Sequence, residues 1–298
     1  MRTLQGPGSG TGGPGREVAA AQAYVAAHTV AMTQWTGPSS APTPKPGMKL
    51  AWVGSDMTNA SAAGYGQAVA TAAKALGWTT TMLNAKGTTD GASAAVDEAI
   101  ALHVNGIATD YPSPGIQPAL QRARAAGIFI VGIHSSATPG PDASQQLYYN
   151  VSQDPAEIGK ATADWAIADS NGTAKVVIVY DSLYPVSVDK ANAMKATIET
   201  CSGCQVLAFD DSPLADVTTR APALATSLVN QFGQSFYILT IADTYLDAKD
   251  GRYSPAGPCS PKPARQSLVK MCRVFDSDAP RRPAKASADM GRRALTKS

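Results

Sequence analysis

Strand patterns and helix patterns alternate along the chain from Lys49 to Asp247, and this regularity limits the fold more than any other feature. The apolar runs are nearly continuous, as in strands that helices cover on both faces. Gly77, Asn105-Gly106 and Gly127 end three successive helical patterns, and glycine suits the left-handed position that follows a helix. Strand-helix-strand units of this length form a parallel, right-handed doubly wound sheet. The pattern therefore predicts an α/β protein.

The alternation breaks once, where loop-forming residues and a short extended segment occupy 138–153. It restarts at Pro155, with Asp154 as the expected N-cap of the next helix. The sequence thus predicts two doubly wound lobes, residues 48–148 and 149–250, joined by a hinge. Polar residues follow almost every strand, and in open α/β sheets ligands bind at that edge.

The two ends of the chain differ from this α/β region. Residues 1–47 are expected to form a disordered start, an Ala-rich helix at 16–35 and a Pro-rich linker. The tail, residues 251–298, carries 11 Lys/Arg and 3 Asp with few apolar residues, which predicts disorder. The alternation stops one or two units early, so the second lobe is expected to be incomplete, with an open sheet edge, through truncation or a shifted reading frame.

Composition excludes several classes of protein. Without the basic tail the chain retains 14 basic and 20 acidic residues, so we predict no nucleic-acid partner. No apolar run approaches the roughly 20 residues of a membrane span, and the start lacks a clear signal peptide. The Gly-rich start lacks the Lys-Ser/Thr of a phosphate loop, there is no G-x-S-x-G elbow, and the three His have no metal-ligand spacing. We therefore predict no cofactor, no metal and no catalytic residue.

The pair Cys201 and Cys204 has the spacing of a redox motif or of half a zinc site. A redox pair belongs at the start of a helix that follows a strand, whereas this pair follows a helix and precedes a strand. Cys259 and Cys272 lie in the tail and do not complete a zinc site. We interpret Cys201 and Cys204 as a small structural disulfide in an oxidising compartment, with a reduced, inert pair as the alternative.

Four local phrases, in order, resemble one known family. They are Lys74-Ala-Leu-Gly-Trp78, the run from Ala119 to Ile133, Asp154-Pro-Ala-Glu-Ile-Gly159, and Ala242-Asp243 after the last strand. Over residues 49–247 the chain resembles the type I periplasmic binding proteins, the sugar-binding receptors of bacterial ABC importers. The resemblance implies a monomer that is not an enzyme, lies in the periplasm or at the cell surface, closes two lobes over a monosaccharide and delivers it to a membrane permease.

The resemblance also places the ligand between the polar strand ends of the two lobes. Asp243 matches the family's ligand-binding Asp, which accepts hydrogen bonds from sugar hydroxyls. The family's Arg near the start of the helix after the 175–180 strand is not evident, and Lys190 is the nearest cation. The expected ligand-binding residues are Asp56, Asn59, Asp110, Tyr111, His134, Asp181, Tyr184, Lys190 and Asp243.

Other interpretations remain open. An Asp that follows a strand is often only the N-cap of the next helix, which applies to Asp56, Asp110 and Asp181. His134 could equally be a polar turn residue. For the whole chain the alternatives are the ligand-sensing core of a related regulator or receptor, an α/β enzyme that uses the same loop edge, and a truncated product that binds nothing.

Overall fold

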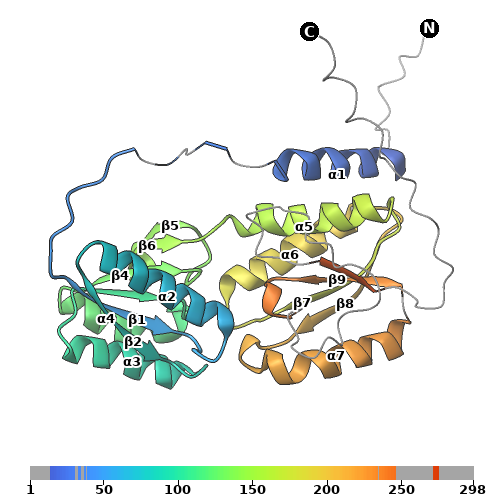
Figure 1. Cartoon of the computed structure of the whole chain (residues 1–298). Coiled ribbons are helices and arrows are strands. Elements are labelled where there is room, and N and C mark those ends of the chain that lie inside the picture. The colour runs from blue at the N-terminus through green and yellow to red at the C-terminus, as the bar shows by residue number, and fades with distance from the viewer. Residues whose placement is uncertain are drawn as a thin grey trace, which may run out of the picture.

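The computed structural model describes residues 14–30, 33–34, 37, 39–233, 235–245 and 271–274. Two α/β lobes lie side by side, and each has helices on both faces of a mainly parallel sheet (Figure 1). The fold class predicted from the alternation is confirmed. Within the described residues no helix is both long and apolar enough to cross a bilayer.

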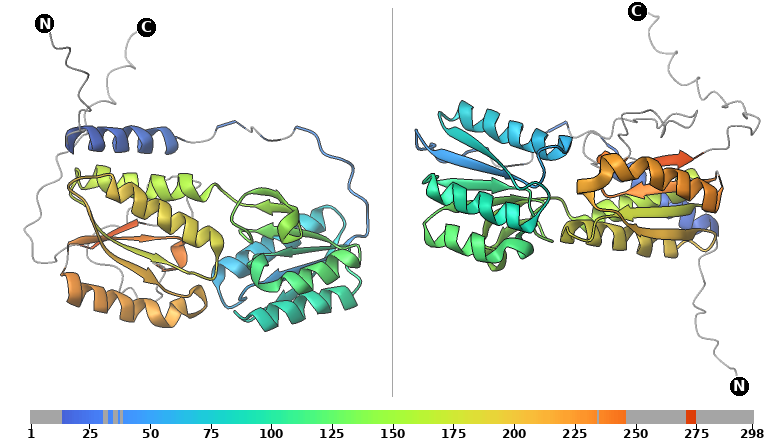
Figure 2. Two further views of the ribbon diagram at one scale, coloured as in Figure 1. Left: turned by 180° about the vertical axis from the view of Figure 1, so that it is seen from behind. Right: turned by 90° about the horizontal axis from the view of Figure 1, so that it is seen from below.

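The first lobe contains a six-stranded sheet of order β2-β1-β3-β4-β6-β5. All neighbouring pairs are parallel except β5 with β6. Helix α2 covers one face, and α3 and α4 cover the other (Figure 2). The elements are β1 (Lys49–Gly54), α2 (Ala60–Ala75), β2 (Thr79–Asn84), α3 (Thr89–Ala101), β3 (Gly106–Thr109), η1 (Ser113–Ile116), α4 (Gln117–Ala125), β4 (Phe129–Ile133), β5 (Gly140–Asp142), η2 (Ala143–Gln145) and β6 (Leu147–Val151).

The second lobe contains a four-stranded sheet of order β10-β9-β7-β8. Its centre is β7, where residues 176–179 are almost completely buried. Helices α5 and α6 lie on one face and α7 on the other (Figure 1). The elements are α5 (Pro155–Asp169), β7 (Lys175–Tyr180), α6 (Pro185–Glu199), β8 (Gln205–Asp211), η3 (Leu214–Asp216), α7 (Val217–Phe232), β9 (Phe236–Thr240), η4 (Asp243–Tyr245) and β10 (Met271–Val274).

The boundary between the two lobes differs from the sequence expectation. The short extended segment after the break is strand β6, which pairs with β4, so the first sheet continues to Val151 and not to 148. Leu147 and Asn150 are buried, which anchors this strand in the first lobe. The predicted helix ends are seen at Gly77 and Gly127, which have φ of 73° and 78°. The prediction for Gly106 is wrong, because His103 is the left-handed residue after α3, with φ of 49°, and Gly106 begins β3.

The N-terminal helix α1 (Pro14–His28) packs on the second lobe although the chain then continues into the first (Figures 1 and 2). Val18 and Ala21 are buried in the second core. The Glu17 carboxylate accepts hydrogen bonds from the backbone N–H and hydroxyl of Ser202, at 2.8 and 3.1 Å. This helix is shorter than the expected 16–35, and the chain between it and β1 leads from one lobe to the other.

The tail contributes one described strand. Residues 271–274 form β10, antiparallel to β9, so β9 is not an open edge of the second sheet. The disorder expected for the rest of 251–298, and for residues 1–13, falls outside the described residues. In the turn between α6 and β8, Cys201 and Cys204 form a disulfide with Cα atoms 5.3 Å apart.

Candidate functional site

The two lobes touch where the carboxyl ends of their strands face each other. The Ser61 hydroxyl at the start of α2 lies 3.3 Å from the Thr244 hydroxyl in η4. Tyr184, which precedes α6 in the second lobe, lies close enough to Ser55, which follows β1 in the first lobe, for Ser55 to influence its hydroxyl. The polar strand ends of both sheets therefore face each other across the contact between the lobes, the cleft region where open α/β folds bind ligands.

Asp110 and Ser55 form the polar centre of the first lobe's edge. The Asp110 carboxylate accepts hydrogen bonds from the Ser55 backbone N–H at 2.6 Å and from its hydroxyl at 3.1 Å. Asp110 is 8% exposed. Burial raises its pKa to about 6, because loss of hydration outweighs the hydrogen bonds that favour the charged form. Asp110 is thus not a helix cap but a link between the ends of β1 and β3.

Three other predicted residues of the first lobe are held by local contacts. The Asp56 carboxylate accepts hydrogen bonds from the Thr58 backbone N–H and hydroxyl. Asn59 is the N-cap of α2, since its side-chain oxygen accepts from the Ser61 N–H at 2.8 Å. Tyr111 is 1% exposed, and its hydroxyl lies 3.0 Å from that of Thr89. These contacts give all three residues a structural role.

Asp181 has the corresponding place after β7 in the second lobe. Its carboxylate accepts hydrogen bonds from the backbone N–H groups of Leu183 and Leu214, at 2.8 and 2.7 Å. Its own N–H donates to the Ser187 hydroxyl. Burial raises the pKa of this carboxyl group. Asp181 therefore joins the start of α6 to the loop after β8.

Tyr184 is surrounded by residues from both lobes. Burial raises the pKa of its hydroxyl, and the charges of Asp110 and Asp181 raise it further. Tyr111 is near enough to contribute as well. Asp110 and Tyr111 of the first lobe thus lie near enough to Asp181 and Tyr184 of the second to interact electrostatically.

The charge of Lys190, in the second lobe, acts on His134 in the first lobe. His134 follows β4 with a left-handed φ of 55°, and its Nδ1 lies 2.9 Å from the Ser152 hydroxyl. Burial lowers the His134 pKa to about 4, and the charge of Lys190 lowers it further. Lys190, on α6, is 5% exposed, and burial lowers its pKa to about 8. At neutral pH a neutral imidazole thus lies near a buried ammonium.

Asp243, the residue that most strongly resembles a ligand contact, begins η4 at the end of β9. The structure describes its backbone but not its side chain. The next residue, Thr244, makes the contact with Ser61 across the cleft. The backbone of Asp243 therefore lies at the same edge as the other predicted residues.

The sequence argument missed three residues of this region. Ser55 binds Asp110 and lies near Tyr184, and its position directly after an apolar run could have identified it. Tyr65 on α2 has its ring centroid 6.4 Å from that of His134, and Ser152 contacts the same imidazole. Neither carries a local signal, because the face that a helix or a crossing segment turns toward the cleft depends on the tertiary fold.

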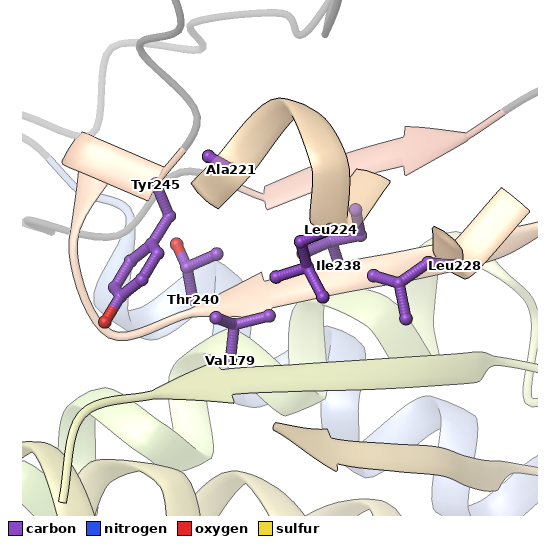
Figure 3. Close-up of a pocket in the computed structure, with 7 residues that line it drawn as sticks. All are labelled: Val179, Ala221, Leu224, Leu228, Ile238, Thr240 and Tyr245. Atoms are coloured by element: carbon purple, nitrogen blue, oxygen red, sulfur yellow. The ribbon is translucent and has the colours of Figure 1, made fainter. Parts of the chain in front are cut away.

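An apolar crevice between α7 and β9 is separate from this cleft (Figure 3). It lies inside the second lobe. Its lining is Val179, Ala221, Leu224, Leu228, Ile238, Thr240 and Tyr245. Such a lining offers little to bind a polar molecule. The described residues also contain no group of three or more His, Cys, Asp or Glu that would suit a metal ion.

Comparison with known proteins agrees with this fold. A family model described as a periplasmic binding protein domain matches residues 50–237. No curated protein matches the chain. Solved structures with the same fold include the periplasmic binding protein component of the arabinose ABC transporter from Shewanella sp. ANA-3, bound to α- and β-L-arabinofuranose. Its TM-score is 0.56 at 16% identity, over 67% of this chain and 66% of that one.

Two further structures are similar. One is an ABC sugar transporter subunit from Rhodobacter sphaeroides 2.4.1, with a TM-score of 0.60 at 18% identity, over 72% of this chain and 76% of that one. The other is an ABC transporter periplasmic solute-binding protein from Actinobacillus succinogenes 130z with bound D-allose. Its TM-score is 0.56 at 16% identity, over 68% of this chain and 70% of that one. The match thus spans about two thirds of the first of these three structures. At such identities the likeness is one of fold.

Proposed function

This chain belongs to the periplasmic binding protein family, and we propose that it binds a small polar solute, a monosaccharide or a close relative of one, between its two lobes. The observation that carries the proposal is the convergence on Tyr184. Strand-end residues of both lobes, Ser55 and Asp110 of the first and Asp181 of the second, all act on the hydroxyl of Tyr184. A ligand in this place would contact both lobes at once.

The chemistry of the cleft suits a polyhydroxylated ligand. Asp110, Asp181 and, by family resemblance, Asp243 supply carboxylates that accept hydrogen bonds from hydroxyl groups. Tyr65 and Tyr184 supply ring surface for the C–H faces of a sugar. Arabinofuranose and D-allose in the solved structures named above belong to this class of molecule.

Binding then follows from a shift between open and closed arrangements of the lobes. A ligand favours the closed arrangement only as far as it binds that arrangement better than the open one. Contacts with both lobes provide this difference in affinity, since one lobe alone offers half of them. We propose that the closed protein, a monomer outside the cytoplasm, delivers the solute unchanged to the permease of an ABC importer.

Isothermal titration calorimetry of the full chain against pentoses, hexoses, polyols and their acids tests the proposal. We expect one of these compounds to bind, and to be recovered chemically unchanged by mass spectrometry. Asp243→Ala should weaken binding by roughly tenfold or more, the effect of losing a charge-assisted hydrogen bond. Asp216→Ala, at an exposed position of the same lobe, is the control and should bind as the wild type does. Absence of binding to every compound, or turnover of one, would contradict the proposed function.

A further inference from the structure

Lys190 is a buried cation in the cleft. It lies in the second turn of α6 and is 5% exposed, yet it forms no hydrogen bond or ion pair with any described residue. Two other lysines differ. Lys160 pairs with Asp164, and Lys195 on the same helix pairs with Glu199 at 3.6 Å. Charged side chains are rarely buried without a partner, because loss of hydration costs several kcal/mol. The missing counter-charge therefore requires an explanation.

The two described carboxylates of this region, Asp110 and Asp181, do not supply it. Asp110 accepts two hydrogen bonds from Ser55, and Asp181 accepts from Leu183 and Leu214. Each carboxylate is thus satisfied within its own lobe. Across the cleft Lys190 influences His134, which is neutral above a pH of about 4 and so adds no negative charge. The only uncompensated charge among the described residues of the cleft is positive.

We propose that the solute carries a carboxylate and that Lys190 binds it, so that the ligand class is the sugar acids. The proposal rests on the proposed function, since it assumes that a solute occupies this cleft. A carboxylate accepts hydrogen bonds from an ammonium and supplies the missing counter-charge. The remaining hydroxyl groups of such a ligand would face Asp110 and Asp181.

A single negative charge fits the cleft better than a phosphate does. A phosphate monoester carries close to two negative charges at neutral pH and binds best to several cations or backbone N–H groups. Here one ammonium lies in a cleft that also contains the carboxylates of Asp110 and Asp181. Repulsion by these two carboxylates would offset much of the attraction between Lys190 and the second negative charge of a phosphate.

Matched pairs of ligands test this inference on the full chain. Calorimetry compares glucose with glucuronate, galactose with galacturonate, and arabinose with arabinonate, and includes the hexose 6-phosphates. We expect one acid to bind at least roughly tenfold more tightly than its neutral counterpart. Lys190→Met should remove this preference, and Lys190→Arg should keep most of it. Lys195→Met, on an exposed part of the same helix, should leave it unchanged. A thermal melt of each variant reports whether it is folded.

The other outcomes separate this inference from the proposed function. If a neutral sugar binds as tightly as its acid, or if a sugar phosphate binds more tightly than the acid, the carboxylate proposal is wrong while solute binding stands. An equal loss of acid and neutral sugar in Lys190→Met would likewise overturn it, because Lys190 would then bind a hydroxyl group. Failure of every compound to bind would overturn both proposals.

Discussion

The two lobes share one architecture but differ in how they are assembled. The described elements of the first sheet come from one continuous stretch, Lys49 to Val151. The second lobe also uses elements that are distant in sequence, since α1 packs on α5 and β10 completes the edge of the sheet beside β9. The lobe that supplies Lys190 therefore depends more on long-range contacts, and we expect its stability to respond more strongly to single changes.

The helices of the two lobes are also packed differently. In the second lobe α5 and α6 approach so closely at Gly159 that an added methyl group would overlap the backbone oxygen of Lys190. In the first lobe Gly64 on α2 faces open space, with no atom within 4 Å of an added methyl group. Close backbone packing in the second lobe positions the part of α6 that carries Lys190.

Gly159→Ala should have the largest effect on stability. The methyl group would separate α5 from α6, and we expect the free energy of unfolding to fall by about 3 kcal/mol. Gly64→Ala is the matched control, and it should raise the free energy of unfolding by about 0.5–1 kcal/mol, because alanine favours the helix. Urea unfolding followed by circular dichroism measures both changes. Similar effects of the two substitutions would refute the difference in helix packing.

The next largest effect on stability should come from the titration of Asp110 and His134, at the strand ends of the first lobe. The Asp110 pKa is raised from 3.8 to about 6, so the folded state binds more protons than the unfolded state, and stability falls as pH rises between these values. The His134 pKa is lowered from 6.5 to about 4, so stability rises with pH over that range. The two contributions oppose each other between about pH 4 and 6, and should nearly cancel in the wild type.

Removing either Asp110 or His134 should reveal how the other residue makes stability depend on pH. We expect the stability of Asp110→Asn to rise with pH, and that of His134→Asn to fall, by up to about 1.4 kcal/mol per pH unit. Urea unfolding at pH 4, 5 and 6 measures the slopes. If both variants followed the wild-type pH dependence, neither residue would be perturbed as the geometry indicates. In the second lobe burial lowers the pKa of Lys190 to about 8, so its contribution to stability changes at higher pH than those of Asp110 and His134.

The sequence predicted the layers of the fold but not the contacts between distant segments. Continuous apolar runs such as 176–179 identify central strands wherever they occur. Strand β6 was harder to assign, because a short run with Tyr148 and Tyr149 exposed resembles a crossing segment as much as an edge strand. At the site, the strand-end position of Asp110 was visible, but its partner Ser55 is 55 residues away. Whether such a carboxylate is satisfied or free depends on the fold.

The docking of α1 should give the smallest of these effects and should be confined to the second lobe. Val18 is 7% exposed and packs in the second core. Val18→Ala removes two buried methyl groups, which should lower stability by about 1.5 kcal/mol. Val30→Ala, at a position that is 70% exposed, is the control and should have no effect. Hydrogen–deuterium exchange by mass spectrometry measures the two lobes separately. Val18→Ala should speed exchange in α5 and α6 by roughly tenfold, the factor that corresponds to about 1.4 kcal/mol. Exchange in β1 and β3 should remain unchanged. Equal acceleration in both lobes would mean that they unfold as one unit, and the difference in assembly would then have no energetic consequence.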